Sequence, residues 1–171
     1  FSGSIGNFIS SVTVGHSKPM LGSSAWPYMD LSDVSVSSES GGTLTITFSD
    51  DGFEGPAALV SDVGGVTWGT IHFEVWVDPD NTLLAKTTQI ADLGSFAGGS
   101  FNGTTSGAFT TGAGPYSITQ VAILTHPATG GNSISSFNLE TKAVPEPATL
   151  GLLGVGLAAL GFNARRRRNA A

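Results

Sequence analysis

The sequence predicts an all-β fold, an antiparallel β-sandwich of the jelly-roll-like or immunoglobulin-like kind, followed by a single hydrophobic helix at the C-terminus. Three observations predict the β domain. Short runs of Thr, Val, Ile and aromatic residues recur along the chain, and these residues favour strands. The 24 glycines, 21 serines and 18 threonines among 171 residues leave few segments that favour helix. Turn signals return about every ten residues, which is typical of about six to nine short antiparallel strands.

The N-terminal part of the chain contains two weaker strand candidates, residues 9–14 and 29–36, in a region rich in Ser and Gly. A clearer strand covers residues 41–48, "GGTLTITF", where apolar residues alternate with threonines. The sequence "DDGFEGP" at residues 50–56 has the composition of a turn. We expect a short apolar strand, residues 57–60, directly after it.

The strongest strand signal comes from "VGGVTWGTIHFEVWVDPDN", residues 63–81. Successive side chains of a strand point to opposite faces. One face therefore takes Ile71, Phe73, Val75 and Val77, and the other takes His72, Glu74 and Trp76. The sequence Asp-Pro-Asp-Asn at residues 78–81 ends the strand as a turn.

The second half of the chain is expected to begin with a return strand at residues 83–90. Residues 93–115, with phenylalanines spaced among glycines, are expected to be loosely ordered. Good strand patterns follow at residues 116–126 and 133–144. The turn sequence "PATGGN" between them predicts that these two strands form a hairpin.

Charge is distributed unevenly along the chain. Residues 1–144 contain twelve of the thirteen acidic residues and only three lysines, a formal charge of −9. This acidic body argues against a nucleic-acid partner, because phosphate binding needs clustered Lys and Arg. The absence of cysteine excludes disulfides, thiolate catalysis and Cys-based zinc sites.

The C-terminal segment combines an apolar run with a basic end. Residues 148–164 carry no charge, and a helix of this length would be about 25 Å long against a bilayer core of about 30 Å. A helix that packs on a protein core has a polar face opposite its apolar stripe, and this run has no polar face. It is followed directly by Arg165, Arg166, Arg167 and Arg168. This order predicts a transmembrane helix with its C-terminal side in the cytoplasm.

The sequence "VPEPATLGLLGVGLAALGF" with the arginine block, residues 144–168, resembles the PEP-CTERM sorting signal of exosortase substrates in Gram-negative bacteria. Pro145, Glu146 and Pro147 occupy the place of its defining triplet. The resemblance implies export, temporary anchoring in the inner membrane, and cleavage by an exosortase near the triplet. It divides the chain into a secreted β-sandwich domain, residues 1–142, and a sorting signal, residues 143–171. The resemblance also implies a final place at the cell surface or outside the cell, in biofilm and extracellular-matrix settings.

No catalytic constellation is visible in the body of the chain. The sequence contains neither an HExxH motif nor a Gly-x-Ser-x-Gly motif. His16, His72 and His126 are scattered, and we expect His72 and His126 to be surface or turn histidines. We therefore expect a protein that is not an enzyme and that needs no cofactor.

Two acidic turns contain candidate calcium ligands, because calcium prefers several carboxylate and carbonyl oxygens. The candidates are Asp50, Asp51 and Glu54 in the first turn, and Asp78, Asp80 and Asn81 in the second. Neither turn has the spacing of an EF-hand. Asp and Asn are also favoured in turns for conformational reasons alone, so the structural alternative stays open.

Trp26, Trp68 and Trp76 are candidates for an aromatic sugar-binding platform. Trp76 lies opposite the apolar face of its strand, which makes it the first candidate for exposure. Packing inside a two-layer sandwich is the alternative for each tryptophan.

The leading functional hypothesis is an exported, non-enzymatic β protein of the cell surface or extracellular matrix. Two alternatives are a carbohydrate-binding module that retains matrix polysaccharide, and a self-assembling subunit of a surface filament. The expected partners are the exosortase and the inner membrane during sorting, and then polysaccharide or further copies of the chain.

Overall fold

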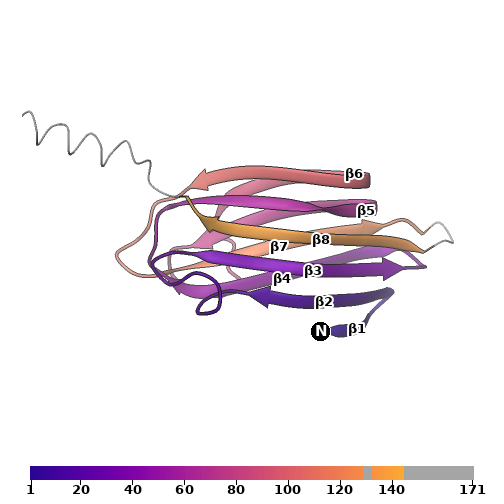
Figure 1. Cartoon of the computed structure of the whole chain (residues 1–171), viewed down its shortest axis with the longest axis horizontal. Coiled ribbons are helices and arrows are strands. Elements are labelled where there is room, and N and C mark those ends of the chain that lie inside the picture. Colours follow the sequence, from indigo (N-terminus) through magenta and orange to yellow (C-terminus); the bar gives the residue numbers. More distant parts are fainter. Residues whose placement is uncertain (129–131, 145–171) are drawn as a thin grey trace, which may run out of the picture.

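A computed structural model describes residues 1–128 and 132–144, which form eight strands in one curled antiparallel sheet (Figure 1). The strands are β1 (Ser2–Ile5), β2 (Phe8–His16), β3 (Tyr28–Ser38), β4 (Gly42–Phe53), β5 (Ala58–Asp78), β6 (Thr88–Ala108), β7 (Tyr116–His126) and β8 (Ser133–Ala143). The predicted all-β, antiparallel class is confirmed. The helix predicted at residues 148–164 lies outside the described residues, and within them no helix is long and apolar enough to cross a membrane.

The long strand β5 joins two layers of the curled sheet. β6 pairs with β5 along nearly its whole length. On the other edge of β5, residues 59–67 pair with β8 and residues 70–78 pair with β7. We call the layer of β1, β2, β3, β8 and the first half of β5 the β8 layer. The layer of β4, β7 and the second half of β5 is the β7 layer.

The change of partner takes place at a bend around Gly69. The register of β5 against β6 shifts between Thr67 and Thr70. A Cβ atom on Gly69 would lie 2.2 Å from the Thr125 carbonyl oxygen, so only glycine allows β5 and β7 to approach this closely. The Gly69 amide also donates a hydrogen bond to the Thr67 hydroxyl at 3.0 Å.

Apolar side chains from both layers fill the space between them in two adjoining clusters. Phe73 is fully buried, and its ring centroid lies 5.0 Å from that of Phe137 on β8. The predicted alternation in β5 is confirmed, because these inward side chains have no exposed area: Ile71, Phe73, Val75 and Val77. The second cluster contains Met29, Phe53 and Tyr116, among others. The core therefore ties β5 to strands from both layers.

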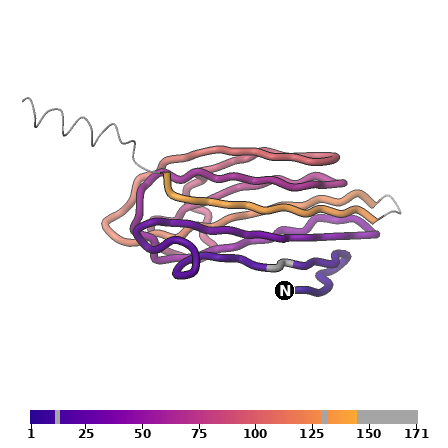
Figure 2. The backbone as a smooth tube through the Cα atoms, in the orientation of Figure 1, coloured from indigo at the N-terminus to yellow at the C-terminus, as the bar shows by residue number. Residues whose placement is uncertain are grey.

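The connections between strands gather at two ends of the sandwich, as the backbone trace shows (Figure 2). We call one end the tail end; residues 17–27, 54–57, 79–87 and 109–115 lie there. The described chain leaves β8 at this end, where the Val144 amide donates to the Ala58 carbonyl at 3.0 Å. The opposite end, with the β5 bend, is the bend end.

Three expectations about the strands need correction here. The short strand at 57–60 and the long strand after it are one strand, β5. The turn expected at 50–56 begins later, because β4 continues to Phe53. Residues 116–126 and 133–144 do form strands, but β7 and β8 lie in opposite layers and do not form a hairpin.

The largest correction concerns residues 83–115. No strand begins at Leu83, and Leu84 has a positive φ of 65° that breaks an extended chain. β6 instead runs from Thr88 to Ala108, through the stretch expected to be loose. Close packing requires glycine at position 107, because a Cβ there would lie 1.8 Å from the Ile90 carbonyl oxygen, whereas Gly94, Gly98 and Gly99 adopt positive φ angles. The glycine-rich composition that predicted a loosely ordered segment here belongs to a curled strand.

Candidate functional site

The predicted sorting residues Pro145, Glu146 and Pro147, and the arginines Arg165 to Arg168, lie outside the described residues. The structure fixes the point at which they leave the domain. Ala143 is the last residue of β8, and its amide donates to the Pro27 carbonyl at 2.9 Å. Together with the hydrogen bond made by Val144, this contact anchors the chain up to the residue before the triplet. The sorting segment therefore starts directly at the tail end.

The three candidate tryptophans do not form one platform. Trp68 is the most exposed of them, with 74 % of its surface accessible, and it lies at the bend end. Trp26 is 42 % exposed and belongs to the loop at the tail end. Trp76 is half-buried, and its indole nitrogen donates to a Glu74 carboxylate oxygen at 2.8 Å. Trp68, and not Trp76, is thus the tryptophan most available to a ligand.

Trp68 borders a shallow pocket of about 310 Å³ at the bend end. The pocket is lined by Trp68, Gly69, Thr70, Thr125 and Pro127. None of these described lining residues carries a charge. The Thr125 and Thr43 hydroxyls lie 3.1 Å apart and hold each other in place. The pocket thus combines an indole, a proline ring and threonine hydroxyls.

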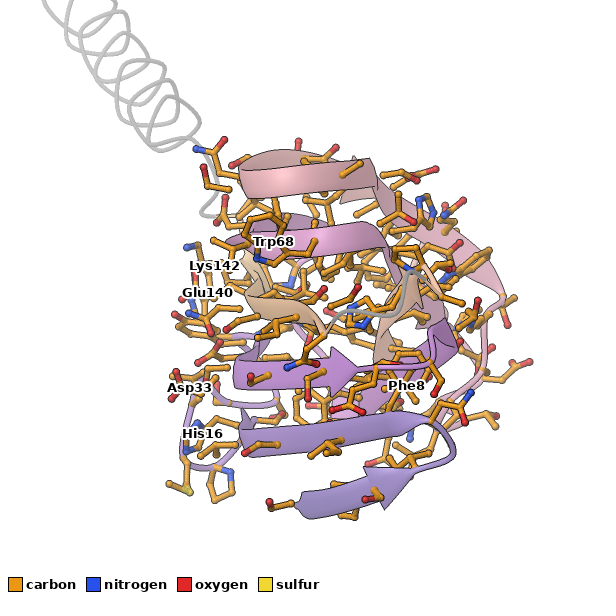
Figure 3. The ribbon with its side chains drawn as sticks, turned by 90° about the vertical axis from the view of Figure 1, so that its right-hand side faces the viewer. Phe8, His16, Asp33, Trp68, Glu140 and Lys142 are labelled. Carbon is orange, nitrogen blue, oxygen red and sulfur yellow. The ribbon has the colours of Figure 1, made fainter. Side chains whose placement is uncertain are left out.

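An apolar surface continues from Trp68 across the outer face of the β8 layer. Val66 is 44 % exposed on the same strand, and Ile134 is 40 % exposed on β8. β5 and β8 pair as far as Thr67 and Ser135, and Trp68 and Ile134 are the next residues along these two strands. Figure 3 shows Trp68 on the same side of the molecule as Glu140 and Lys142. The three apolar side chains therefore form one exposed patch.

His72, Glu74 and Trp76 form a second group of side chains on the face of β5 that points away from the core. His72 Nε2 lies 3.4 Å from a Glu74 oxygen and 3.6 Å from an Asp92 oxygen. Its Nδ1 lies 3.1 Å from the Ser95 hydroxyl. Since Glu74 also accepts a hydrogen bond from Trp76, Glu74 contacts both His72 and Trp76 on the outer face of the β7 layer. His72 is partly exposed, as expected.

The histidine expectation is wrong for His126, which is 2 % exposed. Its side chain turns inward from the last residue of β7 and packs at 5.5 Å from the Phe8 ring. Nε2 lies 2.8 Å from the Ser135 hydroxyl, and Nδ1 has no hydrogen-bond partner among the described residues. Burial lowers the pKa of His126. Ser135 is fully buried too, so this pair is not accessible to a substrate.

The two acidic turns with the candidate calcium ligands are neighbours in space. The Gly52 amide donates to the Asn81 side-chain oxygen at 2.6 Å, which links the turns. Internal donors already engage two of the carboxylates. Asp50 accepts from Ser17 and, at 2.7 Å, from Lys18. Among the described residues, no group of three or more His, Cys, Asp or Glu is arranged to hold a metal ion.

The pKa values of these carboxylates follow from their partners. Burial opposes the ionisation of Asp50, but hydrogen bonds from Lys18 and Ser17 outweigh it and lower the pKa. The hydrogen bonds from the Thr87 hydroxyl and the Thr82 amide lower the pKa of Asp78, which is 3 % exposed. Both side chains are ionised and hold loop residues of the tail end in place. Calcium binding by Asp51, Glu54, Asp80 and the others stays a prediction.

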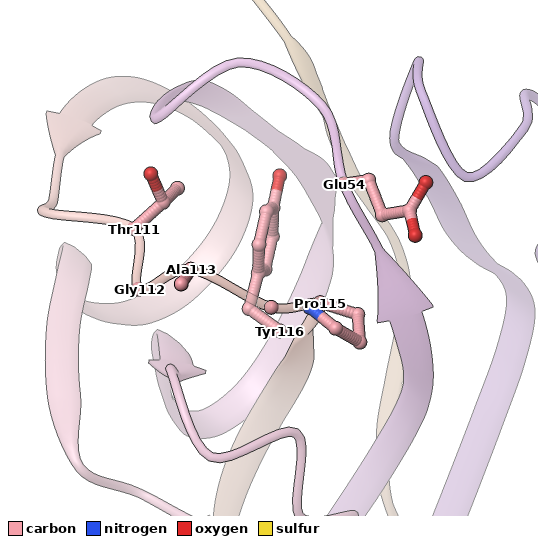
Figure 4. Close-up of a pocket in the computed structure, with 7 residues that line it drawn as sticks. Glu54, Thr111, Gly112, Ala113, Pro115 and Tyr116 are labelled. Atoms are coloured by element: carbon pink, nitrogen blue, oxygen red, sulfur yellow. The ribbon is translucent and has the colours of Figure 1, made fainter.

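A second pocket, of about 290 Å³, opens at the tail end (Figure 4). It is lined by Glu54 and by residues 111–116. The Tyr116 hydroxyl donates to the Pro56 carbonyl at 3.2 Å, and burial raises the pKa of Tyr116 to about 12. Tyr116 is therefore a neutral structural group that closes the loop over the second core cluster.

A ladder of polar side chains that the sequence analysis missed crosses four strands near the tail end. Tyr28 on β3 donates to Glu140 on β8. Lys142 donates to Glu140 at 2.9 Å and lies 3.2 Å from Asp62 on β5. Thr104 on β6 donates to Asp62 at 2.8 Å. The spacing of Glu140 and Lys142 by two was the available signal, since it places both on one strand face.

Residues 143–168 match the family described as the PEP-CTERM protein-sorting motif, which confirms the resemblance of the C-terminal segment. The match covers this segment and not the β domain. It defines the chain as one that carries an exosortase sorting signal behind an all-β domain.

The comparison with curated proteins gives no match. Among solved structures, one from a study of carbohydrate-binding modules of the β-sandwich superfamily aligns at 12 % identity and a TM-score of 0.36 over 81 % of this chain. The chain spans 56 % of that structure's length. A mannan-recognising carbohydrate-binding module aligns at 9 % identity and a TM-score of 0.32, over 81 % of this chain and 90 % of that one.

Proposed function

We propose that the chain is an exported, non-enzymatic protein of the cell surface or extracellular matrix. Its C-terminal segment holds it temporarily in the inner membrane, and an exosortase processes it near Pro145-Glu146-Pro147. The observation that carries this proposal is the sorting motif at residues 143–168. The exit point supports it, because the hydrogen bonds of Ala143 and Val144 precede the triplet. Cleavage at the triplet would therefore leave every described strand in the released domain.

The experiment compares two glutamate variants in producing cells. Glu146→Ala changes the triplet, and the full-length chain should then accumulate in the membrane fraction. Glu39→Ala changes an exposed glutamate at the bend end and serves as the matched control. We expect the control to reach the medium at the level of the unaltered protein. Equal release of both variants would contradict the role of the triplet.

A carbohydrate-binding module is the second candidate function. The exposed Trp68 beside an uncharged pocket favours it, because aromatic rings stack on the apolar faces of sugars. The strand orders also fit the jelly-roll alternative of the predicted sandwich. The long strands β5 and β6 each contribute one half to each layer. From β3 onward the β8 layer has the order β3-β8-β5-β6, and the β7 layer has the order β4-β7-β5-β6.

Self-assembly into a surface filament is the third candidate. Among the described residues, β6 pairs with β5 alone, so its other edge offers unpaired amides and carbonyls. β6 is 21 residues long and carries a single charged residue, Asp92. Such an edge can accept a strand from another copy. Electron microscopy of the extracellular form tests this candidate: filaments would support it, and uniform single particles would reject it.

A further inference from the structure

We propose that the pocket beside Trp68 is a binding site for an uncharged polysaccharide, presented at the end of the domain farthest from the sorting segment. The proposal rests on the second candidate function and gives it a place and a ligand class. It replaces Trp76 with Trp68 as the stacking residue.

The position of Trp68 is fixed by the fold. Thr67 is buried, and its hydroxyl holds the Gly69 amide, so the backbone is fixed on both sides of Trp68. The absence of a side chain on Gly69 allows the close approach to Thr125 that turns β5 from one layer into the other. Trp68 therefore projects from the apex of the bend. This arrangement leaves 74 % of a tryptophan in water, although a buried indole would stabilise the fold.

The chemistry of the lining selects a sugar. An indole face attracts the C–H face of a pyranose ring, and the Thr70 and Thr125 hydroxyls match the hydrogen-bonding capacity of sugar hydroxyls. The pocket volume of about 310 Å³ lies at the lower limit for small-molecule sites, which suits one or two sugar units of a longer chain. Val66 and Ile134 extend the apolar surface beyond the pocket, so a chain can continue past Trp68.

The charges of the pocket and of the whole domain favour a neutral polysaccharide over an ionic one. The described lining residues carry no positive charge to pair with a uronate and no carboxylate to pair with an amino sugar. Residues 1–144 carry a formal charge of −9, which repels polyanions at low ionic strength. The ligand class that meets no electrostatic penalty is a neutral hexose polymer.

The location makes the site usable before and after processing. Val144 leaves the domain at the tail end, whereas Trp68 lies at the bend end. A chain anchored by its C-terminal segment would hold this pocket away from the membrane. Trp26, which is also exposed, lies at the tail end and provides a matched control.

The test uses the full chain in a detergent without a sugar headgroup. Neutral hexasaccharides of glucose and mannose with β-1,3 and β-1,4 linkages are the probes, and an oligogalacturonate and a chitosan oligomer are the charged comparisons. Nitrogen-15 NMR of the three tryptophan indole groups reports the site directly. We expect one or more neutral probes to shift the Trp68 signal. Trp68→Ala should weaken binding at least tenfold, Trp68→Phe should retain most of it, and Trp26→Ala should leave it within twofold.

Several results would overturn the proposal. These are the absence of binding to every neutral probe, unchanged binding in Trp68→Ala, or tighter binding of a charged probe. A second copy of the chain is the rival occupant of this surface. If the wild type sediments as a dimer that Trp68→Ala dissociates, and no probe binds, Trp68 is a self-association residue. Each of these results leaves the sorting proposal intact, since processing is measured separately in cells.

Discussion

The side-chain amide of Gln120, on β7, donates a hydrogen bond to the Leu139 carbonyl, on β8, at 3.2 Å. These strands lie in opposite layers, so one buried side chain connects the layers through the core. The same nitrogen donates to the Thr141 hydroxyl at 2.9 Å. Gln120 is fully buried.

Removing this connection should destabilise the domain. Gln120→Ala leaves the Thr141 hydroxyl without this partner and opens a cavity, so we expect a loss of about 2 to 4 kcal/mol in the free energy of unfolding. Gln120→Met keeps the volume and should cost less. Urea denaturation of the extracellular form measures both. An alanine variant as stable as the wild type would show that the connection contributes little.

The β5 bend should depend on glycine at position 69. Gly69→Ala places a Cβ 2.2 Å from the Thr125 carbonyl, and we expect the required backbone shift to cost about 1 to 3 kcal/mol. Gly64→Ala is the control on the same strand, because its Cβ would meet only the Phe101 carbonyl at 3.8 Å. Thermal unfolding should separate the two variants. Equal melting temperatures would contradict the close approach at the bend.

His126 should make the domain less stable in mild acid. Burial lowers the pKa of His126 in the folded state, so the unfolded chain takes up a proton first as the pH falls. Stability should therefore decline below about pH 6.5, the usual histidine pKa, well above the range in which carboxylates titrate. His126→Gln should flatten this part of the stability profile. A profile that keeps its slope in His126→Gln would assign the effect elsewhere.

The Tyr28 hydroxyl should control the ionisation of Glu140. Its hydrogen bond, with a second from Lys142, lowers the pKa of Glu140. Tyr28→Phe should raise that pKa toward its usual value, which NMR titration measures directly. The effect on the free energy of unfolding should stay below about 1 kcal/mol, because the carboxylate is partly exposed. Tyr116→Phe is the control and should leave the Glu140 titration unchanged.

Sequence patterns predicted the strands that are straight and carry regular alternation. β7 was predicted at its observed bounds, and the inward face of β5 around Phe73 was correct. β6 was missed because its order comes from pairing with β5 over its full length, whereas its own composition is glycine-rich. The inward turn of His126 also depends on a long-range contact, with Phe8. Neither fact is visible in local sequence.

The sorting motif was readable because it is a linear signal, independent of tertiary structure. Which tryptophan is exposed at the candidate sugar site could not be predicted from the sequence. Trp68 and Trp76 are separated by an even number of residues, so alternation alone places them on the same face of a straight strand. The bend at Gly69 assigns them to the outer faces of different layers, and Trp76 donates a hydrogen bond to the Glu74 carboxylate.

The intact mass of the extracellular protein tests the central claim most directly. It is compared between cells with and without a functional exosortase. We predict an extracellular form whose C-terminus lies near Pro145-Glu146-Pro147, and its loss, with retention of the complete chain in the membrane fraction, when the exosortase is absent. An extracellular form that always ends at Ala171 would contradict the account.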